Sequence, residues 1–368
     1  MRLADRRTSL GANGYSAVVL SSRAEIRQLR DVASRLMRQE EPTLATEFFL
    51  ASLYKGWRPR VVVVSYDREA VGIMYTKERI IYGIPTGMVY ADGALSGILL
   101  ANPLHHQKAF SLAVEALLAS PGIHGVRLRV ARAGEEHKAV RQLSASRSVH
   151  SHDSSIEYQD FPLGEAHAHL PLAHSYDQFL AGLGYTTRHN FRYYRRRFEA
   201  SGHRFVEHLS IDELRRAELD LRPKSKFTAR WQQRKIEKGL NMVAAASQPL
   251  AVGLKHLNGE WLGVIGGWYR PGGAVLCFQC NNERDFGPDS LSVVLRAYLI
   301  EFLIRQGLEE LVIWHGTRPP LSRYVSYVPV IGVRLDQLTY SWRAIRWLVS
   351  MVGPRLPRRF ADTARWIA

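Results

Sequence analysis

The sequence predicts an α/β (α+β) protein with two similar halves, each a mixed, mostly antiparallel sheet flanked by helices. Residues 248–315 give the clearest signals. Three apolar runs separated by turn signals predict a meander of antiparallel strands at about 250–257, 260–269 and 274–280. Apolar residues at helical spacing then predict a helix over 290–306. The short apolar run 311–314 is typical of a strand covered on both faces.

Turn and capping residues support these elements. Asn258-Gly259 predicts a tight hairpin in which both residues have positive φ, and Pro271–Gly273 predicts a second turn. Asp289 or Ser290 can cap the helix, and Gly307 can end it. Because the helix joins two strands of one sheet, those strands should run parallel, with a crossover connection.

The first half shows the same order of elements: helices, a hairpin, a further strand, a long helix and a strand. The expected helices cover 23–38, 43–54 and 103–119, and the expected strands cover 60–66, 70–77, 86–90 and 125–130. The Ser- and His-rich stretch 144–155 is interpreted as a linker, and strands at 156–161 and 166–172 follow it. The expected division is an N-terminal half at 1–155, a C-terminal half at 156–340 and a basic apolar tail at 341–368.

The chain has a large excess of positive charge. Its net charge is +16, from 50 Lys and Arg against 34 Asp and Glu in 368 residues. Such an excess favours a polyanionic partner: nucleic acid, anionic lipid, an acidic carrier protein or a nucleotide-bearing donor. The two cysteines, Cys277 and Cys280, fall in a predicted strand and are expected to be buried and structural. Without a disulfide framework, a secretory signal or a membrane-length apolar run, we expect a cytoplasmic protein.

The densest cluster of charge is the predicted helix over 186–201. Phe191, Tyr194 and Phe198 form one stripe along it, and a neighbouring stripe consists of Arg188, Arg192, Arg195 and Arg196. Arginine binds phosphate and carboxylate through paired hydrogen bonds and stacks on flat groups, so this helix suits an acidic donor or acceptor. The expected ligand contacts are Arg188, Arg192, Arg195 and Tyr194. The alternative is a solvated basic face above a packed aromatic seam.

A second anion site is predicted where the meander leads into the 290–306 helix. Free backbone N–H groups and the helix dipole make a helix N-terminus attractive to phosphate. The loop here is 281–290, and its candidate contacts with a donor's phosphates are Asn281, Arg284, Gly287 and Ser290. In the first half, Leu99–Pro103 precedes the long helix and contains no glycine, so we expect that half to lack a donor site.

The order of meander, loop, helix and buried strand resembles the core of the GNAT acyltransferase fold, whose corresponding loop holds the pyrophosphate of coenzyme A. Arg284 and Gly287 fit the loop pattern of that superfamily. Ser175–Leu180 and Arg188–Arg192 resemble helix motifs of its Fem-type (FemABX) aminoacyltransferases and its cellulose-biosynthesis (CelD-like) acetyltransferases. The resemblance covers about 170–335 and, by element order alone, the first half.

The resemblance implies an N-acyltransferase that moves an acyl group, acetyl or longer, from acyl-CoA to an amine such as an amino sugar, in envelope or exopolysaccharide synthesis. The amine must lose a proton, and His315, at the end of the buried strand, is the candidate general base. Tyr324 is the candidate for returning a proton to the thiolate. Backbone N–H groups of the last meander strand would polarise the thioester carbonyl. The alternative for His315 is a hydrogen-bonded strand-end histidine.

Other interpretations stay open. The positive charge also suits Fem-like transfer from aminoacyl-tRNA or from an acyl carrier protein. A non-enzymatic basic adaptor is favoured by Asp289, which stands where the superfamily has a small residue. It is also favoured at Tyr324, because many members of the resembling branch have Tyr-Lys at the end of the catalytic half and no such Lys is present here. The tail at 341–368 suits either peripheral contact with an anionic membrane or packing against the body. No histidine group has the spacing of a metal site, so no metal is expected.

Overall fold

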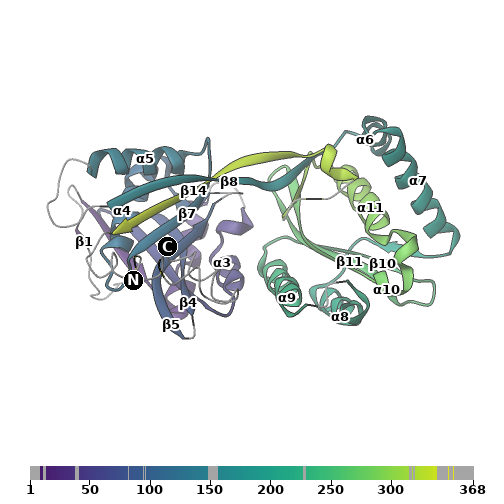
Figure 1. Cartoon of the computed structure of the whole chain (residues 1–368), viewed down its shortest axis with the longest axis horizontal. Helices are drawn as coiled ribbons and strands as arrows, with labels where there is room; N and C mark the ends of the chain where they lie inside the picture. Colours follow the sequence, from purple (N-terminus) through teal and green to yellow (C-terminus); the bar gives the residue numbers. More distant parts are fainter. Residues whose placement is uncertain are drawn as a thin grey trace. The chain divides into compact units, whose positions relative to one another are not determined.

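The computed structural model describes residues 9–10, 14–37, 41–81, 83–93, 95, 97–147, 156–226, 229–314, 317, 320–337, 347 and 351. The chain forms two compact units, each with its own core (Figure 1). Unit 1 comprises Met1–Met37, Lys55–Gly164 and the chain from Pro329, and unit 2 comprises Arg38–Tyr54 and Glu165–Val328. The units interleave in sequence, unlike the contiguous division expected, because strands β8 (Ile156–Pro171) and β14 (Ser326–Gln337) each pass from one unit to the other.

Unit 1 is built on a mixed sheet with the strand order β1-β2-β3-β4-β5-β7-β14, and β6 pairs with β4. Neighbouring strands are antiparallel except β5 and β7, which run parallel. Helices α4 and α5 contribute to the core of this unit, where Phe110 and Leu117 are fully buried. The elements are β1 (Ser9–Leu10), β2 (Tyr15–Leu20), α1 (Arg23–Arg27), α2 (Arg30–Leu36), β3 (Trp57–Tyr66), β4 (Glu69–Ile81), β5 (Ile84–Asp92), β6 (Leu99–Ala101), η2 (Pro103–His105), α4 (His106–Leu118), β7 (Gly125–Ala131) and α5 (Glu135–Arg147).

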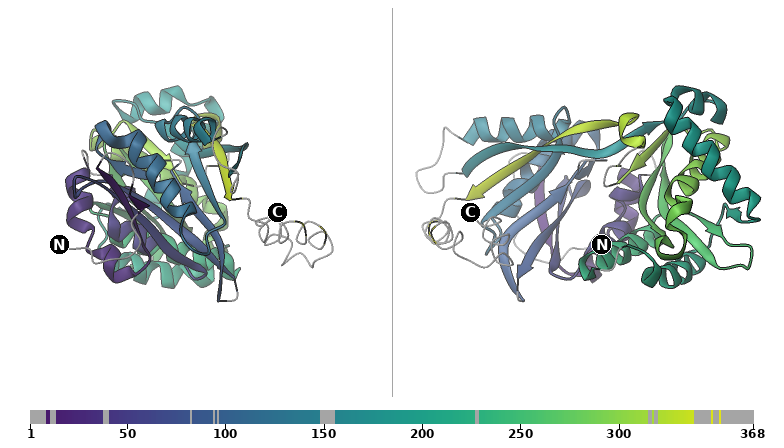
Figure 2. Two further views of the ribbon diagram at one scale, coloured as in Figure 1. Left: turned by 90° about the vertical axis from the view of Figure 1, so that its left-hand side faces the viewer. Right: turned by 45° about the vertical axis from the view of Figure 1, so that its right-hand side comes forward.

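Unit 2 has the strand order β8-β13-β12-β11-β10-β9. Helices α6, α7 and α11 lie on one face of this sheet, and α8 and α9 pack against the other (Figures 1 and 2). The elements are η1 (Pro42–Leu44), α3 (Thr46–Ser52), α6 (Tyr176–Gly182), α7 (Tyr185–Ala200), β9 (Arg204–Val206), α8 (Ile211–Leu221), η3 (Arg222–Lys224), α9 (Arg230–Ala245), β10 (Pro249–Lys255), β11 (Trp261–Arg270), β12 (Gly273–Asn281), α10 (Glu283–Phe286), η4 (Gly287–Asp289), α11 (Leu291–Arg305), β13 (Glu310–Ile313) and η5 (Leu321–Arg323).

The two units share one topology. Each contains an antiparallel meander of three strands, then a helix, then a strand parallel to the last meander strand: β3-β4-β5-α4-β7 in unit 1 and β10-β11-β12-α11-β13 in unit 2. The parallel crossover predicted for the second half is therefore confirmed, and so is the predicted fold class. At the end of α11, Gly307 has the expected left-handed backbone (φ 74°), and the Leu308 N–H bonds to the Leu303 carbonyl (3.1 Å).

Strand β12 carries a β-bulge. Gly266 of β11 lies opposite Phe278, and the next residue, Gly267, lies opposite Leu276, so Cys277 is one extra residue in β12. Because of this extra residue, Cys277 and Phe278 both lie next to Gly239 of α9, on the face of the sheet away from α11.

Two consecutive glycines permit this register. A Cβ added at Gly266 would overlap the ring of Phe278, and one added at Gly267 would overlap the carbonyl oxygen of Val275. Backbone approaches as close as this one exclude every residue with a side chain. The Gly-Gly pair in the second meander strand is thus a requirement of the bulge.

The hairpin between β10 and β11 is present, but its turn differs from the expected one. Gly259 has positive φ (93°), whereas Asn258 does not. The Asn258 Oδ1 accepts a hydrogen bond from the Glu260 N–H (3.0 Å), and the His256 N–H donates to the Glu260 carbonyl (2.8 Å). The loop is therefore longer than two residues and needs only one left-handed glycine.

Three other elements differ from the sequence-based bounds. The helix expected over 23–38 is divided at 28–29 into α1 and α2, and Ile26, Leu29 and Ala33 are all buried. Helix α5 reaches residue 147, inside the stretch expected to be a linker, whose remainder lies outside the described residues. The two strands expected at 156–161 and 166–172 are one continuous strand, β8.

Within the part of the chain that the structure describes, no helix has the length and apolar character needed to span a bilayer. The tail expected at 341–368 falls outside the described residues except for Trp347 and Met351, both of which are exposed.

The bulge gives a test of the fold. We expect Gly267→Ala to lower the free energy of unfolding by at least about 3 kcal/mol, because its Cβ would overlap the Val275 carbonyl oxygen. Gly182→Ala is the matched control, since a Cβ at Gly182, the last residue of α6, meets open space. Urea denaturation followed by tryptophan fluorescence measures both changes. Equal and small losses in the two variants would contradict the assigned register.

Candidate functional site

The end of the β12–β13 ladder is the feature from which the site is built. The parallel pairing ends at Leu276 and Ile313, and one further bond joins the Trp314 N–H to the Leu276 carbonyl (3.0 Å). Beyond this point, Cys277–Asn281 of β12 has no backbone partner on the β13 side among the described residues. We call this segment the open edge of β12.

The corresponding strands of unit 1 stay paired to their ends. The parallel ladder between β5 and β7 extends to Asp92, the last residue of β5, and the Gly93 N–H continues it by donating to the Arg129 carbonyl (2.8 Å). In the described part of unit 1, the last meander strand therefore has no counterpart of the open edge.

A polar cluster lies beside the open edge, between α11 and the sheet. Arg296 of α11 donates from Nε to Gln279 Oε1 (3.0 Å) and from Nη1 to Thr317 Oγ1 (2.9 Å). The amide of Gln279 also donates to Asn281 Oδ1 (3.3 Å) and to the Ser292 carbonyl (3.4 Å), which fixes its orientation. Burial lowers the pKa of the Arg296 guanidinium. The cluster is thus a partly buried cation held by neutral groups.

The loop expected at 281–290 is helical in its centre, where α10 and η4 occupy it. Ser290 is the N-cap residue of α11, but its backbone is left-handed (φ 47°, ψ 44°) and its side chain makes no capping bond. Ser290 therefore stands at the expected N-cap position but does not cap the helix with its side chain. The N–H groups of Val293 and Val294 bond instead to the Ser290 carbonyl (2.8 and 3.2 Å).

The four residues predicted to contact a donor's phosphates occupy different environments. Asn281 is buried at the end of β12 and accepts from Gln279, whereas Arg284 and Gly287 are exposed and Ser290 is half-buried. No described contact brings the four together, and their role stays a prediction.

Three carboxylates lie in the same loop, and two of them form ion pairs. Glu283 pairs with Lys226 (2.7 Å), and Asp289 pairs with Arg197 of α7 (2.9 Å). Because both cations already have a carboxylate partner, they are less available to a phosphate. A diphosphate bound at this loop would therefore have to compete with Glu283 and Asp289 for these two cations.

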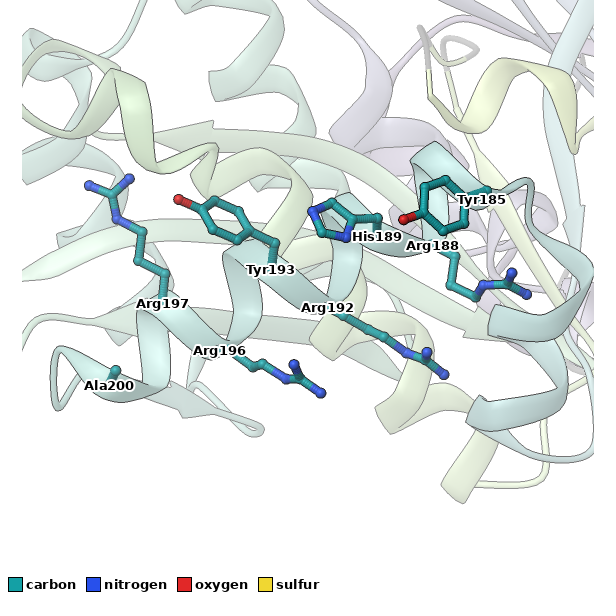
Figure 3. Close-up of a pocket in the computed structure, with 8 residues that line it drawn as sticks. All are labelled: Tyr185, Arg188, His189, Arg192, Tyr193, Arg196, Arg197 and Ala200. Atoms are coloured by element: carbon teal, nitrogen blue, oxygen red, sulfur yellow. The ribbon is translucent and has the colours of Figure 1, made fainter.

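A hollow lies on the outer face of α7, and the residues that line it all belong to that helix (Figure 3). The lining residues are Tyr185, Arg188, His189, Arg192, Tyr193, Arg196, Arg197 and Ala200. The rings of Tyr185, His189 and Tyr193 follow one another with near-parallel planes, at centroid separations of 6.2 and 6.0 Å. We call these three rings the ring column.

An arginine row runs beside the ring column. Arg188, Arg192 and Arg196 recur every four residues, so their Cα atoms are spaced by about 6 Å along the helix. In Figure 3 their guanidinium groups extend to one side of the rings. Tyr185 and Tyr193 are 76% and 48% exposed, so the column is open to a ligand. Phosphates and flat rings are the chemical groups that such a surface can bind.

Arg195 and Tyr194, also predicted as ligand contacts, do not line this hollow. Position 195 is four residues after the buried Phe191, so it faces the inner side of the helix rather than the outer row. There the Arg195 guanidinium pairs with Glu199 (2.9 Å) and with Glu301 of α11 (2.7 Å). Tyr194 is half-buried against the core of unit 2. Arg195 thus joins α7 to α11.

Of the two predicted catalytic residues, only Tyr324 is among the described residues. Tyr324 lies at the start of α7, where its hydroxyl accepts a hydrogen bond from the N–H of Gly184 (2.7 Å). This bond lowers the pKa of the Tyr324 phenol. His315 lies outside the described residues. The catalytic roles of both residues stay predictions.

The strand order of unit 2, its bulged last meander strand and the repetition of the same topology in unit 1 define a tandem GNAT-like fold of the Fem type. No protein-family model matches the sequence, and no curated protein matches it significantly. The fold is nevertheless found among solved structures.

Three of these structures align with most of the chain. FemX has a TM-score of 0.58 and 11% identity, covering 87% of this chain and 97% of that chain. The C-terminal DUF2156 domain of a putative lysylphosphatidylglycerol synthetase from Agrobacterium fabrum has a TM-score of 0.53 and 12% identity, covering 90% and 97%. The L-PGS structure from Bacillus licheniformis has a TM-score of 0.50 and 14% identity, covering 85% and 91%. At these identities the likeness establishes the fold alone.

Two groups of residues at the site were not among the sequence-based candidates. Arg296 is the single charged residue in the otherwise apolar stretch Val293–Ile300, a signal that a search for buried charge would have found. Tyr185, His189 and Tyr193 are visible in the sequence as aromatic residues at four-residue spacing. Among the described residues, no His, Cys, Asp and Glu side chains are grouped in threes or more to hold a metal ion.

Cys277 and Cys280 are buried free cysteines, as predicted. Burial raises the pKa of each thiol from its ordinary value of 9.0 to about 12. At pH 8 this lowers the thiolate fraction roughly a thousand-fold, and the thiolate is the reactive form. The native protein should therefore react very slowly with a thiol reagent, while the urea-unfolded chain reacts at both cysteines. Rapid labelling of one native thiol per chain would contradict this placement.

Proposed function

We propose that this chain is an aminoacyltransferase that uses aminoacyl-tRNA as its donor and holds the transferred group beside the open edge of β12. The observation that carries the choice of donor is the outer face of α7. There a column of stacked, exposed rings lies next to a row of arginines. Aromatic rings stack on unpaired bases, and arginines at regular spacing pair with successive phosphates.

A single-stranded RNA end fits this surface better than a duplex does. In a duplex the base faces are covered by their neighbours, so rings on a protein surface have nothing to stack on. The acceptor end of a tRNA is single-stranded and carries the aminoacyl ester. The net charge of +16 adds a general attraction for such a polyanion.

The loop before α11 favours the same choice. Glu283 and Asp289 place carboxylates where the superfamily binds the pyrophosphate of coenzyme A. One of the similar structures is a putative lysylphosphatidylglycerol synthetase, and the product in that name carries an amino acid. Aminoacyl transfer by the present chain agrees with both observations.

The chemistry would take place at the open edge. A backbone N–H of β12 aimed at the ester carbonyl would stabilise the oxyanion that forms when the acceptor attacks. An amine acceptor must lose its proton during this step, and His315 is our candidate for the base. The Tyr324 hydroxyl, oriented by the Gly184 N–H, is the candidate proton donor to the leaving oxygen.

Binding to a labelled single-stranded RNA oligonucleotide tests the proposal. We expect each of Arg188→Ala, Arg192→Ala and Arg196→Ala to weaken binding and to reduce the slope of log Kd against log salt by about 0.7–1, because each loses one phosphate contact. Tyr193→Ala should weaken binding to the single strand but not to an RNA duplex of the same length. Fluorescence anisotropy at several salt concentrations measures all of these changes.

Arg215→Ala is the matched control, because Arg215 is an exposed arginine on α8 of the same unit. Its binding curve should coincide with that of the unaltered chain. If Arg215→Ala weakens binding as much as Arg192→Ala does, the RNA is held by net charge alone and the α7 surface is not the site.

A second candidate is N-acyl transfer from acyl-CoA to an amine such as an amino sugar. It is favoured by the first two N–H groups of α11, those of Leu291 and Ser292, which have no backbone acceptor in the described part of the chain. Arg284, exposed on α10, could reach a phosphate bound there.

Calorimetry with acyl-CoA distinguishes the two candidates. If coenzyme A binds at the start of α11, Arg284→Ala should weaken the affinity about tenfold or more, since it removes a charged hydrogen bond. Gly287→Glu should weaken it through like-charge repulsion. If acyl-CoA releases no heat while RNA binds, the second candidate is excluded.

A further inference from the structure

We propose that Arg296 is the receptor for an oxyanion, carboxylate or phosphate, on a ligand that enters beside the open edge of β12. The inference stands whether the donor is aminoacyl-tRNA or acyl-CoA, because it rests on the polar cluster between α11 and the sheet. Three properties of that cluster carry it: a missing counter-charge, unused N–H groups and a fixed orientation.

The missing counter-charge distinguishes Arg296 from Arg195 and Arg222, two other partly buried arginines of unit 2. Arg195 pairs with two glutamates, and Arg222 pairs with Glu218 through two hydrogen bonds (3.0 and 2.7 Å). Arg296 bonds only to neutral oxygens, and no carboxylate of the described chain lies within ion-pair distance of it. A desolvated cation without a partner opposes folding. A ligand that supplies the negative charge would remove this penalty.

The guanidinium has donors left for such a ligand. It carries five N–H groups, of which Nε donates one to Gln279 and Nη1 donates one to Thr317, so three remain. Both N–H groups of Nη2 are among the three, because neither bond uses that nitrogen. An arginine with free N–H groups suits the oxygens of a carboxylate or a phosphate, which accept paired hydrogen bonds from it.

The guanidinium is also held in place before a ligand arrives. Gln279 cannot turn freely, because its amide donates to Asn281 and to the Ser292 carbonyl. Ser292 belongs to the first turn of α11, so the cluster lies near the positive end of that helix dipole. The fixed orientation of the guanidinium and the field of the helix dipole therefore both favour a negatively charged ligand.

Thermal unfolding with two anion probes tests the inference. The probes are inorganic phosphate and succinate, each added at constant ionic strength maintained with sodium chloride. We expect at least one probe to raise the unfolding midpoint of the unaltered chain by about 2–4 °C, as a ligand specific to the folded state does. A rise with phosphate alone assigns a phosphate ligand, and a rise with succinate alone assigns a carboxylate ligand.

Arg296→Gln should abolish that rise and, without probe, unfold at a higher temperature than the unaltered chain, because an unpaired buried charge has been removed. Arg305→Gln is the matched control: Arg305 lies on the same helix, is exposed and pairs with Glu207, so the probe effect should persist. Thr317→Asp supplies an internal carboxylate to Arg296. It should raise the midpoint and remove the probe effect, and it keeps the test valid if Arg296→Gln fails to fold.

The inference is overturned if neither probe raises the midpoint of the unaltered chain, or if the rise persists in Arg296→Gln or in Thr317→Asp. It is also overturned if Arg296→Gln folds but unfolds at a lower temperature without probe, since Arg296 would then be a stabilising structural residue. Loss of RNA binding in the α7 variants does not affect these outcomes, so the failure of one proposal is distinguishable from the failure of the other.

Discussion

The pairing of β12 with its two neighbours is the constraint on which the rest of unit 2 depends. On one side, the antiparallel ladder with β11 accommodates an extra residue, Cys277, opposite Gly266 and Gly267. On the other side, the parallel ladder with β13 ends at Leu276, the residue just before the bulge. The bulge changes which side chains face α11, and it directs Gln279 toward Arg296. One inserted residue therefore determines both the open edge and the polar cluster beside it.

The two units share one topology but differ in whether a buried charge has an oppositely charged partner. In unit 1, the fully buried carboxylate of Glu78 accepts from Arg58 (2.6 Å), from Arg60 (2.8 Å) and from the Gly87 N–H (3.1 Å). The charge is compensated within the unit, and the neighbouring parallel strands stay paired. In unit 2 the corresponding strands separate, and Arg296 has only neutral partners. A complete set of internal partners is typical of a structural element, whereas an incomplete set is typical of a binding site.

Local signals in the sequence were sufficient for the elements of unit 2 but not for its site. The meander, α11 and β13 could be predicted because apolar periodicity and turn residues are short-range features. The position of Arg195 could not be predicted. The predicted arginine stripe included this residue, which faces the inner side of the helix, and its partner Glu301 lies on another helix. The division into units was also hidden, since two strands and the segment 38–54 cross between them.

The residues of the candidate site were harder to predict from the sequence than the helices and strands. Arg188 and Arg192 were predicted as ligand contacts because four-residue spacing is visible in the sequence; both line the hollow on α7, and their role as contacts stays a prediction. Arg296 was not predicted as a site residue. Its distinguishing feature is that its partners, Gln279 and Thr317, are neutral, and these lie 17 and 21 residues away in the sequence, outside its own helix. The loop at 281–290 was predicted as an anion cradle, but the sequence gives no warning that α10 fills it and that Lys226 and Arg197 bind its carboxylates.

The ion pairs between α7 and its neighbours have a consequence for the size of the ligand. Arg195 fastens α7 to α11 through Glu301, and Arg197 fastens the same helix to Asp289 just before α11 begins. The arginine row on α7 and Arg296 on α11 therefore lie on two helices that are joined to each other, at a separation set by this packing. A molecule that is anchored at the row and reacts at the open edge must span that separation. Ligand length, independently of chemical identity, then becomes a criterion by which this protein can accept one donor and refuse another.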